Sequence, residues 1–345
     1  MRHMRASAAL ACAGVMLAGL AAGCSNSSSS SGSGGSAGTA SETSITVGYQ
    51  PDLHGAAPML IAQQQGFFKK VGLNVTLQQF SSGPPLFTAL KSGSLDFGYE
   101  GPGVAATVIK GGGEILTVDS LSYGDEVVAN PGIKSVSDLR GKTVGVDLGT
   151  SSQMILDLAL QQAGVPLSSV NEVNFTPAAA AAAYESHHLP ALALWIPPIV
   201  PAVKAVPGTK VLVTDRNFTP SYEFPQFWLT MSSYAKAHPQ TVTKFLEAWI
   251  LADNWRASHL SQDVNIVSSA TQVPASSLTP QVSATGWLTG SQLESDYQSG
   301  AEDTWFQKLE QFFVTDKLLT SVVPTSQFIN TSYFAAALKA DNLPS

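Results

Sequence analysis

Three short segments of the chain are rich in Ser, Thr and Gly, and each stands between an expected strand and an expected helix. They are residues 81–84 (Ser-Ser-Gly-Pro), 101–103 (Gly-Pro-Gly) and 149–152 (Gly-Thr-Ser-Ser). Free backbone N–H groups at a helix start carry about half a positive charge, and hydroxyl groups add donors. Glycine lets a ligand approach the backbone closely. Ordinary capping explains each segment alone, whereas three segments directed at one point predict a site for a small anion.

The expected elements that position these segments are alternating strands and helices. A series of apolar runs has the length and spacing of strands, and helical patterns separate them. The runs are residues 45–49, 74–77, 95–99, 143–146, 170–175 and 192–195. Repeated strand–helix units predict an α/β fold with open, largely parallel sheets and helices on both faces. Ligands of such sheets bind outside the carboxyl ends of strands, where helix starts converge.

The strand–helix scheme restarts after residue 132, so the second block is inserted within the first. This arrangement predicts two lobes joined by two crossover strands, with a ligand in the cleft between the lobes. We expect lobe I to comprise residues 44–128 and 226–345, and lobe II to comprise residues 129–225.

The first residues predict export. Residues 6–22 are almost all Ala, Leu, Val, Met and Gly, a run shorter than the about 20 residues needed to cross a bilayer. We therefore expect a signal peptide over residues 1–23. Residues 20–24 (Leu-Ala-Ala-Gly-Cys) resemble the lipobox of bacterial lipoproteins, although Ala fills the usual Leu position. The resemblance implies lipidation of Cys24, with residues 24–43 as a lipidated, Ser/Gly-rich tether; the alternative is an ordinary cleaved signal.

Composition excludes several classes of function. The chain has two cysteines, and Cys12 would leave with the signal peptide while Cys24 would carry lipid. The mature chain is therefore expected to hold no disulfide and no thiolate metal site. We also expect no other metal and no cofactor. Charged residues make up 12% of the chain, the net charge is -7, and no block of Lys and Arg occurs. These values argue against a nucleic-acid partner.

Short motifs follow one another in a recognisable order along the mature chain. They are residues 45–50 (Ile-Thr-Val-Gly-Tyr-Gln), 66–68 (Gly-Phe-Phe), 92–98 (Ser-Gly-Ser-Leu-Asp-Phe-Gly), 138–142 (Asp-Leu-Arg-Gly-Lys) and 149–152. Their order resembles that of substrate-binding proteins of the nitrate, sulfonate and taurine ABC importers, most closely the aliphatic sulfonate binders. The resemblance implies a type II periplasmic-binding fold, a monomer held by lipid outside the cytoplasmic membrane, and delivery of the ligand to a membrane permease.

The resemblance also implies which residues lie at or near the cleft. They are Gln50, Ser82, Gly83, Gly101, Gly103, Thr150, Ser151 and Trp195. His54, in the loop after the first strand, and Phe224, at the second crossover, are further candidates for ligand contact. Many relatives read Trp-Asp-Pro where this chain has Trp195, Ile196 and Pro197, which argues against taurine. Glu100 and Asp125 are the carboxylates that could replace the missing one, and the sequence leaves their direction open.

Three functions are weighed. The first is capture of a small oxyanion such as an aliphatic sulfonate, taurine or nitrate. The second is binding of a thiamine-precursor pyrimidine or another small ring, contacted by His54, because relatives that handle that pyrimidine carry a similar His. The third is an enzyme of pyrimidine biosynthesis, which the export signal, the lack of a mature cysteine and the lack of a nucleophile–base pair oppose. An acidic side chain in the cleft separates the first two.

Overall fold

The structure is a computed structural model that describes residues 42–340. The expected signal peptide, Cys24 and nearly all of the expected tether lie outside the described residues. Within residues 42–340, no helix has both the length and the apolar character that a membrane span requires.

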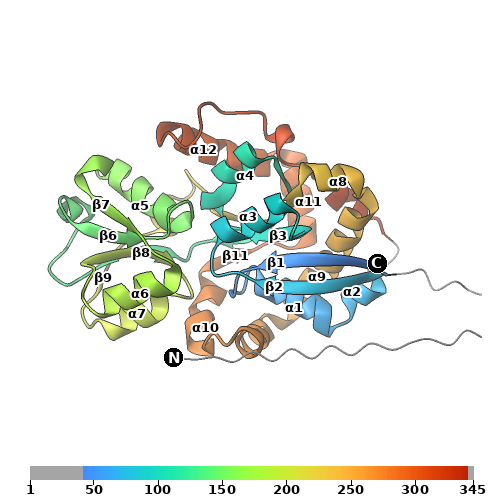
Figure 1. Cartoon of the computed structure of the whole chain (residues 1–345), viewed down its shortest axis with the longest axis horizontal. Helices are drawn as coiled ribbons and strands as arrows, with labels where there is room; N and C mark the ends of the chain where they lie inside the picture. The colour runs from blue at the N-terminus through green and yellow to red at the C-terminus, as the bar shows by residue number, and fades with distance from the viewer. Residues whose placement is uncertain (1–41, 341–345) are drawn as a thin grey trace, which may run out of the picture. The chain divides into compact units, whose positions relative to one another are not determined.

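Lobe I is built on a sheet of mixed direction (Figure 1). In spatial order its strands are β11 (Thr285–Trp287), β4 (Gly113–Ser122), β10 (Pro225–Met231), β3 (Phe97–Glu100), β1 (Thr43–Tyr49) and β2 (Leu73–Gln79). The neighbours β1, β2 and β3 run parallel, whereas β10 is antiparallel to both β3 and β4. The carboxyl ends of β1 and β3 therefore lie at the same edge of the sheet.

Lobe II carries the second sheet, drawn in green at the left of Figure 1. In spatial order its strands are β7 (Asn171–Asn174), β6 (Thr143–Val146), β8 (Ala191–Trp195), β5 (Asp125–Ala129) and β9 (Lys210–Thr214). Strands β6, β7 and β8 run parallel, and β5 is antiparallel to β8 and β9.

The two sheets correct the expectation of largely parallel pairing and one lobe boundary. Strands β5 and β10 are the first strands after each crossover, so each enters its sheet against the direction of its neighbours. Because β5 pairs with β8 and β9, it belongs to lobe II, and the first crossover lies at residues 123–124 rather than at 128–129. The second crossover ends where β10 begins, next to the expected boundary at 225–226.

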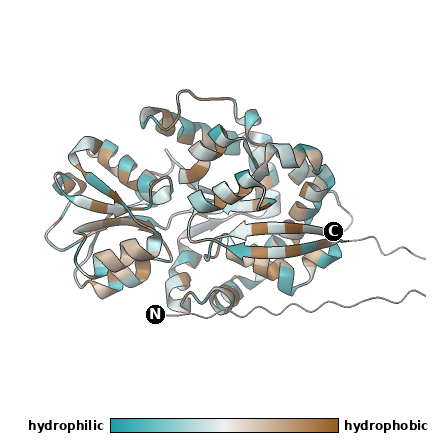
Figure 2. Ribbon diagram, in the orientation of Figure 1, coloured by the Kyte–Doolittle hydropathy of each residue, from teal (hydrophilic) through white to brown (hydrophobic). Residues whose placement is uncertain are grey.

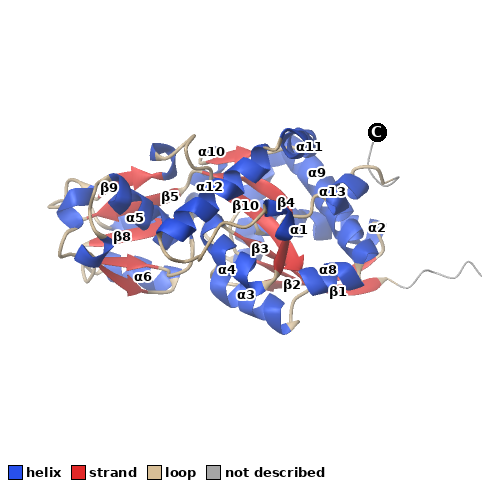
Figure 3. Ribbon diagram, turned by 90° about the horizontal axis from the view of Figure 1, so that it is seen from above, coloured by secondary structure: helices blue, strands red, loops and turns tan. Residues whose placement is uncertain are grey.

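Helices cover the faces of both sheets (Figure 3). Those of lobe I are α1 (Ala56–Gln64), α2 (Phe67–Lys70), α3 (Gly83–Ser92), α4 (Ala105–Gly111), α8 (Ser232–Ala237), α9 (Pro239–Thr271), α10 (Ala275–Ser283), α11 (Gly290–Ser299), α12 (Ala301–Thr315) and α13 (Ser332–Ala337). Those of lobe II are α5 (Ser151–Gln162), α6 (Pro177–Glu185) and α7 (Ile199–Ala205). Most of these helices carry both hydrophobic and polar residues, as expected for elements that pack on one side, whereas α6 is nearly all alanine (Figure 2).

Local sequence explains where the helices near the cavity begin and end. Thr150 is the N-cap of α5, and its side-chain oxygen accepts the N–H of Ser152. Helix α3 ends at Gly93, whose φ of 77° is a left-handed conformation that glycine adopts without strain. Helix α3 follows β2 and helix α5 follows β6. The first turn of each helix therefore lies near the carboxyl ends of the parallel strands of its own sheet.

The core of lobe I contains an aromatic stack beneath the sheet. Trp228 of β10 is fully buried and lies 5.6 Å from Tyr99 and 5.7 Å from Phe245, measured between ring centroids. Phe245 in turn stacks on Phe97 at 4.1 Å. Burial of each such side chain contributes about 1.5–3 kcal/mol, so this stack fixes β3 and β10 against α9.

Candidate functional site

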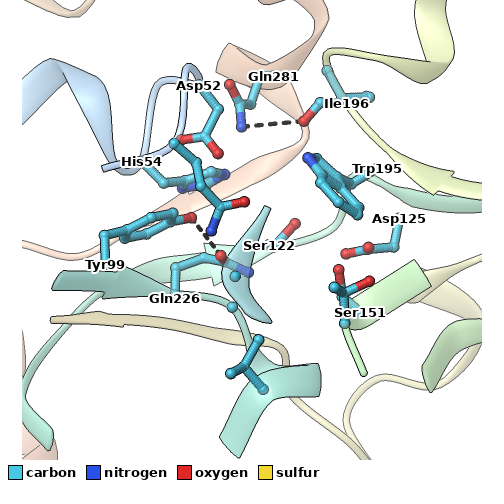
Figure 4. A pocket seen from close by; sticks show the side chains of 15 residues that line it. Asp52, His54, Tyr99, Ser122, Asp125, Ser151, Trp195, Ile196, Gln226 and Gln281 are labelled. Atoms are coloured by element: carbon cyan, nitrogen blue, oxygen red, sulfur yellow. Dashed lines mark hydrogen bonds between the residues drawn. The ribbon is translucent and has the colours of Figure 1, made fainter. Parts of the chain in front are cut away.

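A small cavity lies where the two lobes face each other (Figure 4). Its free volume is about 30 Å³. The lining residues come from both sheets and from the first turns of neighbouring helices; they are Gln50, Asp52, His54, Gly83, Tyr99, Gly101, Val104, Ser122, Asp125, Thr150, Ser151, Trp195, Ile196, Gln226 and Gln281. We call this cavity the polar pocket.

Asp125, at the start of β5, is the carboxylate most clearly presented to the polar pocket. It is 1% exposed, and its Oδ1 has no hydrogen-bond partner. Burial raises its pKa, while hydrogen bonds from Ser151 and Asp215 oppose that rise. Burial raises the pKa of Asp215 well above its usual range, so Asp215 is the protonated member of the pair. Figure 4 shows the Asp125 carboxyl beside Ser151 and Trp195.

Asp52 is the second carboxyl group of the polar pocket. It is 4% exposed, and its Oδ1 accepts the N–H of Gly55 at 2.7 Å, immediately before α1. Burial raises the pKa of Asp52 to about 6, and His54 and the Gly55 N–H oppose the rise. Asp52 therefore supports the start of α1 and also adds negative charge to the pocket at neutral pH.

Apart from His54, no basic side chain lines the polar pocket in the described part of the chain. The buried guanidinium of Arg256 instead pairs with Asp119 at 3.1 Å and with Asp253 at 2.7 Å. Its plane also covers the ring of Trp287 at 4.6 Å. Burial acts to raise the pKa of Asp119, but the charge of Arg256 together with the hydrogen bonds from His54 and Ser120 lowers that pKa below its usual range. Arg256 is thus neutralised within lobe I.

His54 links this buried ion pair to the pocket wall. Its Nδ1 lies 2.7 Å from Ser120 Oγ, and Ser120 Oγ donates to Asp119 Oδ2 at 2.7 Å. Because the Ser120 proton is directed to Asp119, Nδ1 of His54 must carry a proton and donate. The Nε2 atom lies 3.3 Å from Thr285 Oγ1, and the ring lies 5.3 Å from Trp287. His54 is therefore held by protein partners and offers the pocket little more than its ring.

Three amide side chains complete the polar wall. Gln226 Oε1 accepts the hydroxyl proton of Tyr99. Gln281 Oε1 accepts the N–H of Leu53 at 2.8 Å, and its Nε2 donates to Ile196 O at 3.5 Å, a contact between lobe I and lobe II. Gln50, at the end of β1, is 7% exposed. The amide oxygens of Gln226 and Gln281 are thus engaged.

The three Ser/Thr/Gly-rich segments, residues 81–84, 101–103 and 149–152, differ in how they reach the polar pocket. The first turn of α5 reaches the pocket through Thr150 and Ser151. The start of α3 contains Pro84 and Pro85, which have no N–H to offer a ligand. The third segment leads into a short 3₁₀ turn, Pro102–Val104. Among the described residues, the α5 terminus is the one of the three segments whose hydroxyl-bearing residues line the pocket.

Most of the predicted site residues lie in the wall of the polar pocket: Gln50, His54, Gly83, Gly101, Thr150, Ser151 and Trp195. Their contact with a ligand stays a prediction. Ser82 does not reach the pocket, because its hydroxyl bonds Asp147 across the lobes. Gly103 packs on the backbone of Thr150.

Two further residues named from the sequence also lie outside the pocket wall. Phe224 is fully buried in the second crossover, where its carbonyl accepts the N–H of Ser122 at 2.9 Å. Glu100 lies behind the backbone of Gly83, so that a Cβ added to Gly83 would stand 2.1 Å from its Oε2. Burial raises the pKa of Glu100 well above its usual range. Of the two carboxylates whose direction the sequence left open, Asp125 thus faces the pocket.

Sequence reasoning missed several residues of the pocket wall: Asp52, Tyr99, Val104, Ser122, Ile196, Gln226 and Gln281. Asp52 and Ser122 follow or end strands, which is a signal that could have found them. Gln226 and Gln281 come from β10 and α10, distant in sequence from the other segments, and no local pattern indicates where they lie.

Residues 54–259 match a family model described as NMT1/THI5 like. A provisionally named binding protein of Brucella abortus is 31% identical over 292 residues, which are 85% of this chain and 92% of that protein. A provisionally named aliphatic sulfonates-binding protein of Bacillus subtilis is 31% identical over 233 residues, 65% of this chain and 68% of that protein.

Solved structures confirm the expected fold. The periplasmic nitrate-binding protein of Synechocystis PCC 6803 superposes with a TM-score of 0.70 at 16% identity, covering 88% of this chain and 91% of that one. The described residues therefore have the two-lobed type II fold of periplasmic binding proteins, as the sequence motifs predicted.

Proposed function

Because the chain belongs to the NMT1/THI5-like family, we propose that it is an extracytoplasmic solute-binding protein of an ABC importer. The family includes relatives whose names describe binding proteins, and the chain spans 92% of one of them. In this role the two lobes close on a small solute, and the closed form docks on a membrane permease. Export through residues 1–23 and lipid anchoring through Cys24 are part of the proposal, as is a monomeric state.

The ligand that suits the polar pocket best is a small organic solute with N–H donors, either an amine or an amino-substituted nitrogen ring. The observation that carries this choice is the buried, unpartnered Oδ1 of Asp125. An acceptor left without a donor in a buried site costs about 1–3 kcal/mol, and a ligand N–H removes that cost. Asp52 adds a second carboxyl group, and the absence of Lys and Arg from the described lining leaves the pocket without a permanent positive charge.

An oxyanion is the second candidate. The first turn of α5, with Thr150 and Ser151, favours a negative group, and one relative is named for aliphatic sulfonates. The nearby carboxyl of Asp125 opposes a simple anion, because two negative charges at this depth repel strongly. A zwitterion such as taurine satisfies both features, with its sulfonate at α5 and its ammonium at Asp125.

The hydrogen bonds among Ser120, His54 and Asp119 run in a direction that argues against hydrolytic catalysis. In a nucleophilic triad the serine donates its proton to the histidine. Here Ser120 donates to Asp119, and His54 donates to Ser120. Ser120 is also fully buried, so a binding protein without a catalytic role remains our proposal.

The test is ligand binding to the full chain, measured by calorimetry and by the midpoint of thermal unfolding. Four compounds separate the chemistries: ethylamine, ethanesulfonate, taurine, and a 4-amino-5-hydroxymethylpyrimidine. We expect a compound with N–H donors to bind, and Asp125→Asn to weaken that binding by about tenfold to hundredfold, the value of a charge-assisted hydrogen bond. Glu126→Gln is the matched control, because neighbouring residues of a strand point to opposite faces. Binding of ethanesulfonate alone, unaffected by Asp125→Asn, would establish the second candidate instead.

A further inference from the structure

A second, larger cavity adjoins the polar pocket. Its free volume is about 310 Å³, against about 30 Å³ for the polar pocket. The two cavities share Gln50, Asp52 and Trp195 in their walls. The larger cavity therefore adjoins the site already described, and Trp195 belongs to the wall that the two cavities share. In Figure 4 the indole of Trp195 lies beside Ile196, where the chain leaves β8 toward α7.

The wall of this second cavity is mostly apolar. Proline is the commonest residue type in it: Pro51, Pro177, Pro197, Pro198, Pro201 and Pro274. Proline has no backbone N–H, so these positions offer a ligand only apolar surface and carbonyl oxygens. Among the described lining residues, Asp52 is the one with a formal charge, and it lies on the side shared with the polar pocket. We call this cavity the proline chamber.

Both lobes contribute to the proline chamber. Lobe I supplies Phe80, after β2, and the start of α10, while lobe II supplies the start of α6 and the residues around α7. An occupant would therefore touch both lobes at once and bury its apolar surface only when they are together. Such an occupant favours the closed arrangement through its differential affinity for that state.

The volumes of the two cavities limit the groups that each can hold. The polar pocket has room for a compact polar group only, whereas a cavity of about 150 Å³ already holds a benzene ring. We propose, building on the proposed function, that the solute has two parts: an N–H-bearing head in the polar pocket, and an aryl or short alkyl group that passes Trp195 into the proline chamber. The chamber thereby selects among solutes that share the same head.

The experiment compares compounds that differ only in the apolar part. Ethylamine and 2-phenylethylamine share one head, and 4-amino-2-methylpyrimidine and its 5-benzyl derivative share another. Dissociation constants are measured by calorimetry on the full chain. Burial of a phenyl group predicts that the aryl member of a pair binds about tenfold to hundredfold more tightly than the member without it.

Variants at the start of α6 localise the effect. Ala178 lines the proline chamber and is exposed to solvent, so Ala178→Trp fills the chamber without entering the core. Ala179 is the next residue of the same helix, is also exposed and does not line the chamber, which makes Ala179→Trp the matched control. We expect Ala178→Trp to abolish the advantage of the aryl compounds and leave the small heads unaffected, and Ala179→Trp to change neither.

The outcomes separate this inference from the proposed function. If the small heads bind and respond to Asp125→Asn, but the aryl group gives no advantage, the two-part ligand is overturned while the proposed function stands. If the aryl compounds bind more tightly, respond to Ala178→Trp and ignore Asp125→Asn, the chamber is established and the N–H head is overturned. Equal loss with both tryptophan variants, or no binding of any of the four compounds, overturns the two-part ligand.

Discussion

Asp125 and Asp215 occupy one buried site but hold different charge states. The N–H of Asp125 donates to Asp215 Oδ2 at 2.8 Å, and both side chains are removed from water. The two side chains also interact with each other, and two ionised carboxylates in contact would repel, so one of them retains a proton. Burial and the charge of Asp125 raise the pKa of Asp215 well above its usual range. Asp125 keeps the partners that favour ionisation, among them the hydroxyls of Ser151 and Ser122.

Ligand binding should depend on pH in a direction that identifies the ligand. The pKa of Asp125 is raised by burial, and burial raises that of Asp52 to about 6. Above these values both groups are ionised and attract an ammonium group; as pH falls through them the attraction is lost. We expect the affinity for ethylamine to fall by up to about tenfold per pH unit below the raised values.

An oxyanion should behave in the opposite way, because protonation of Asp125 removes repulsion and adds a donor. The measurement is the dissociation constant of ethylamine and of ethanesulfonate between pH 5 and pH 8. In Asp125→Asn the slope should decrease, and in Glu126→Gln it should not. An ethylamine affinity that rises as pH falls would contradict the assignment of Asp125 as the ligand's partner.

The residues found from the sequence and those missed differ in what determines their position. Thr150 and Ser151 follow a strand and start a helix, so local pattern alone brings them to the carboxyl edge of the sheet. The direction of Asp125 depends instead on β5 joining lobe II, where it pairs with Trp195 of β8. A shift by one residue would have turned its carboxyl to the other face. The register depends on the pairing of β5 with β8, so the sequence around Asp125 alone does not determine it.

At the scale of elements, the contact of α5 and β7 with the end of α12 is the least expected feature. Asp157, Glu172 and Asp316 meet there, one from each element or its end, and Asp157 is 5% exposed. Burial and the two neighbouring carboxyls raise the pKa of Asp157 to about 10. Asp157 is therefore protonated at neutral pH, and neither of its carboxyl oxygens has a hydrogen-bond partner in the structure. No local sequence pattern indicates this contact, because α12 lies far from α5 and β7 in the chain.

Replacing Asp157 by an uncharged residue should stabilise the protein to an extent that depends on pH. A folded-state pKa above the unfolded value of 3.8 means that this contribution to stability is complete below about pH 4 and is lost as pH rises toward 10. Asp157→Asn supplies a permanent N–H donor, so we expect it to raise the free energy of unfolding by about 1–3 kcal/mol at pH 8 and to change little at pH 3. Urea unfolding at both pH values measures this.

The control for this prediction is Glu294→Gln, which removes a carboxylate from the exposed face of α11. Its effect should stay within about 0.5 kcal/mol at either pH. Destabilisation by Asp157→Asn at pH 8 would show that Asp157 is ionised there and paired with a cation.

The buried strand β4 shows why part of the fold escaped prediction. All ten of its residues, Gly113–Ser122, are buried, and they include Glu114, Asp119 and Ser120. A sequence with carboxylates in its middle does not have the alternation of a half-exposed strand, nor the continuous apolar run of a buried one. The acidic residues are tolerated because α9 supplies Arg256 to Asp119, a pairing across 137 positions of sequence. By contrast β1 and β6, with regular apolar spacing, were predicted nearly to the residue.

At the scale of the whole lobe pair, the lobes meet through backbone as well as side chains. Gly103 of lobe I lies so close to α5 of lobe II that an added Cβ would stand 2.0 Å from the carbonyl carbon of Thr150 and 2.3 Å from the N of Ser151. Ser82 also bonds Asp147 across the lobes, and burial raises the pKa of Asp147 to about 6. These contacts lie next to the polar pocket, so the described arrangement is the closed one, in which a ligand is surrounded.

Gly103→Ala should therefore prevent closure of the two lobes without preventing folding. The atoms that the new methyl group meets belong to backbone and cannot rotate away, so the lobes must stay apart by about the size of that group. The backbone of Gly103 is not in the left-handed region, and the strand pairing of each sheet is left intact, so we expect near-normal unfolding of the ligand-free protein. Ligand affinity should fall at least about tenfold, because the contacts from the second lobe are lost.

Small-angle scattering with saturating 2-phenylethylamine measures closure directly. The unsubstituted protein should contract when the ligand is added, and Gly103→Ala should keep its ligand-free radius of gyration. Gly132→Ala is the control, because a Cβ at Gly132 meets nothing within 4 Å. A Gly103→Ala protein that contracts and binds like the unsubstituted one would show that Gly103 and α5 are not in contact when the ligand is held. The ligand would then have to be enclosed by a different approach of the lobes, with Thr150 and Ser151 farther from lobe I.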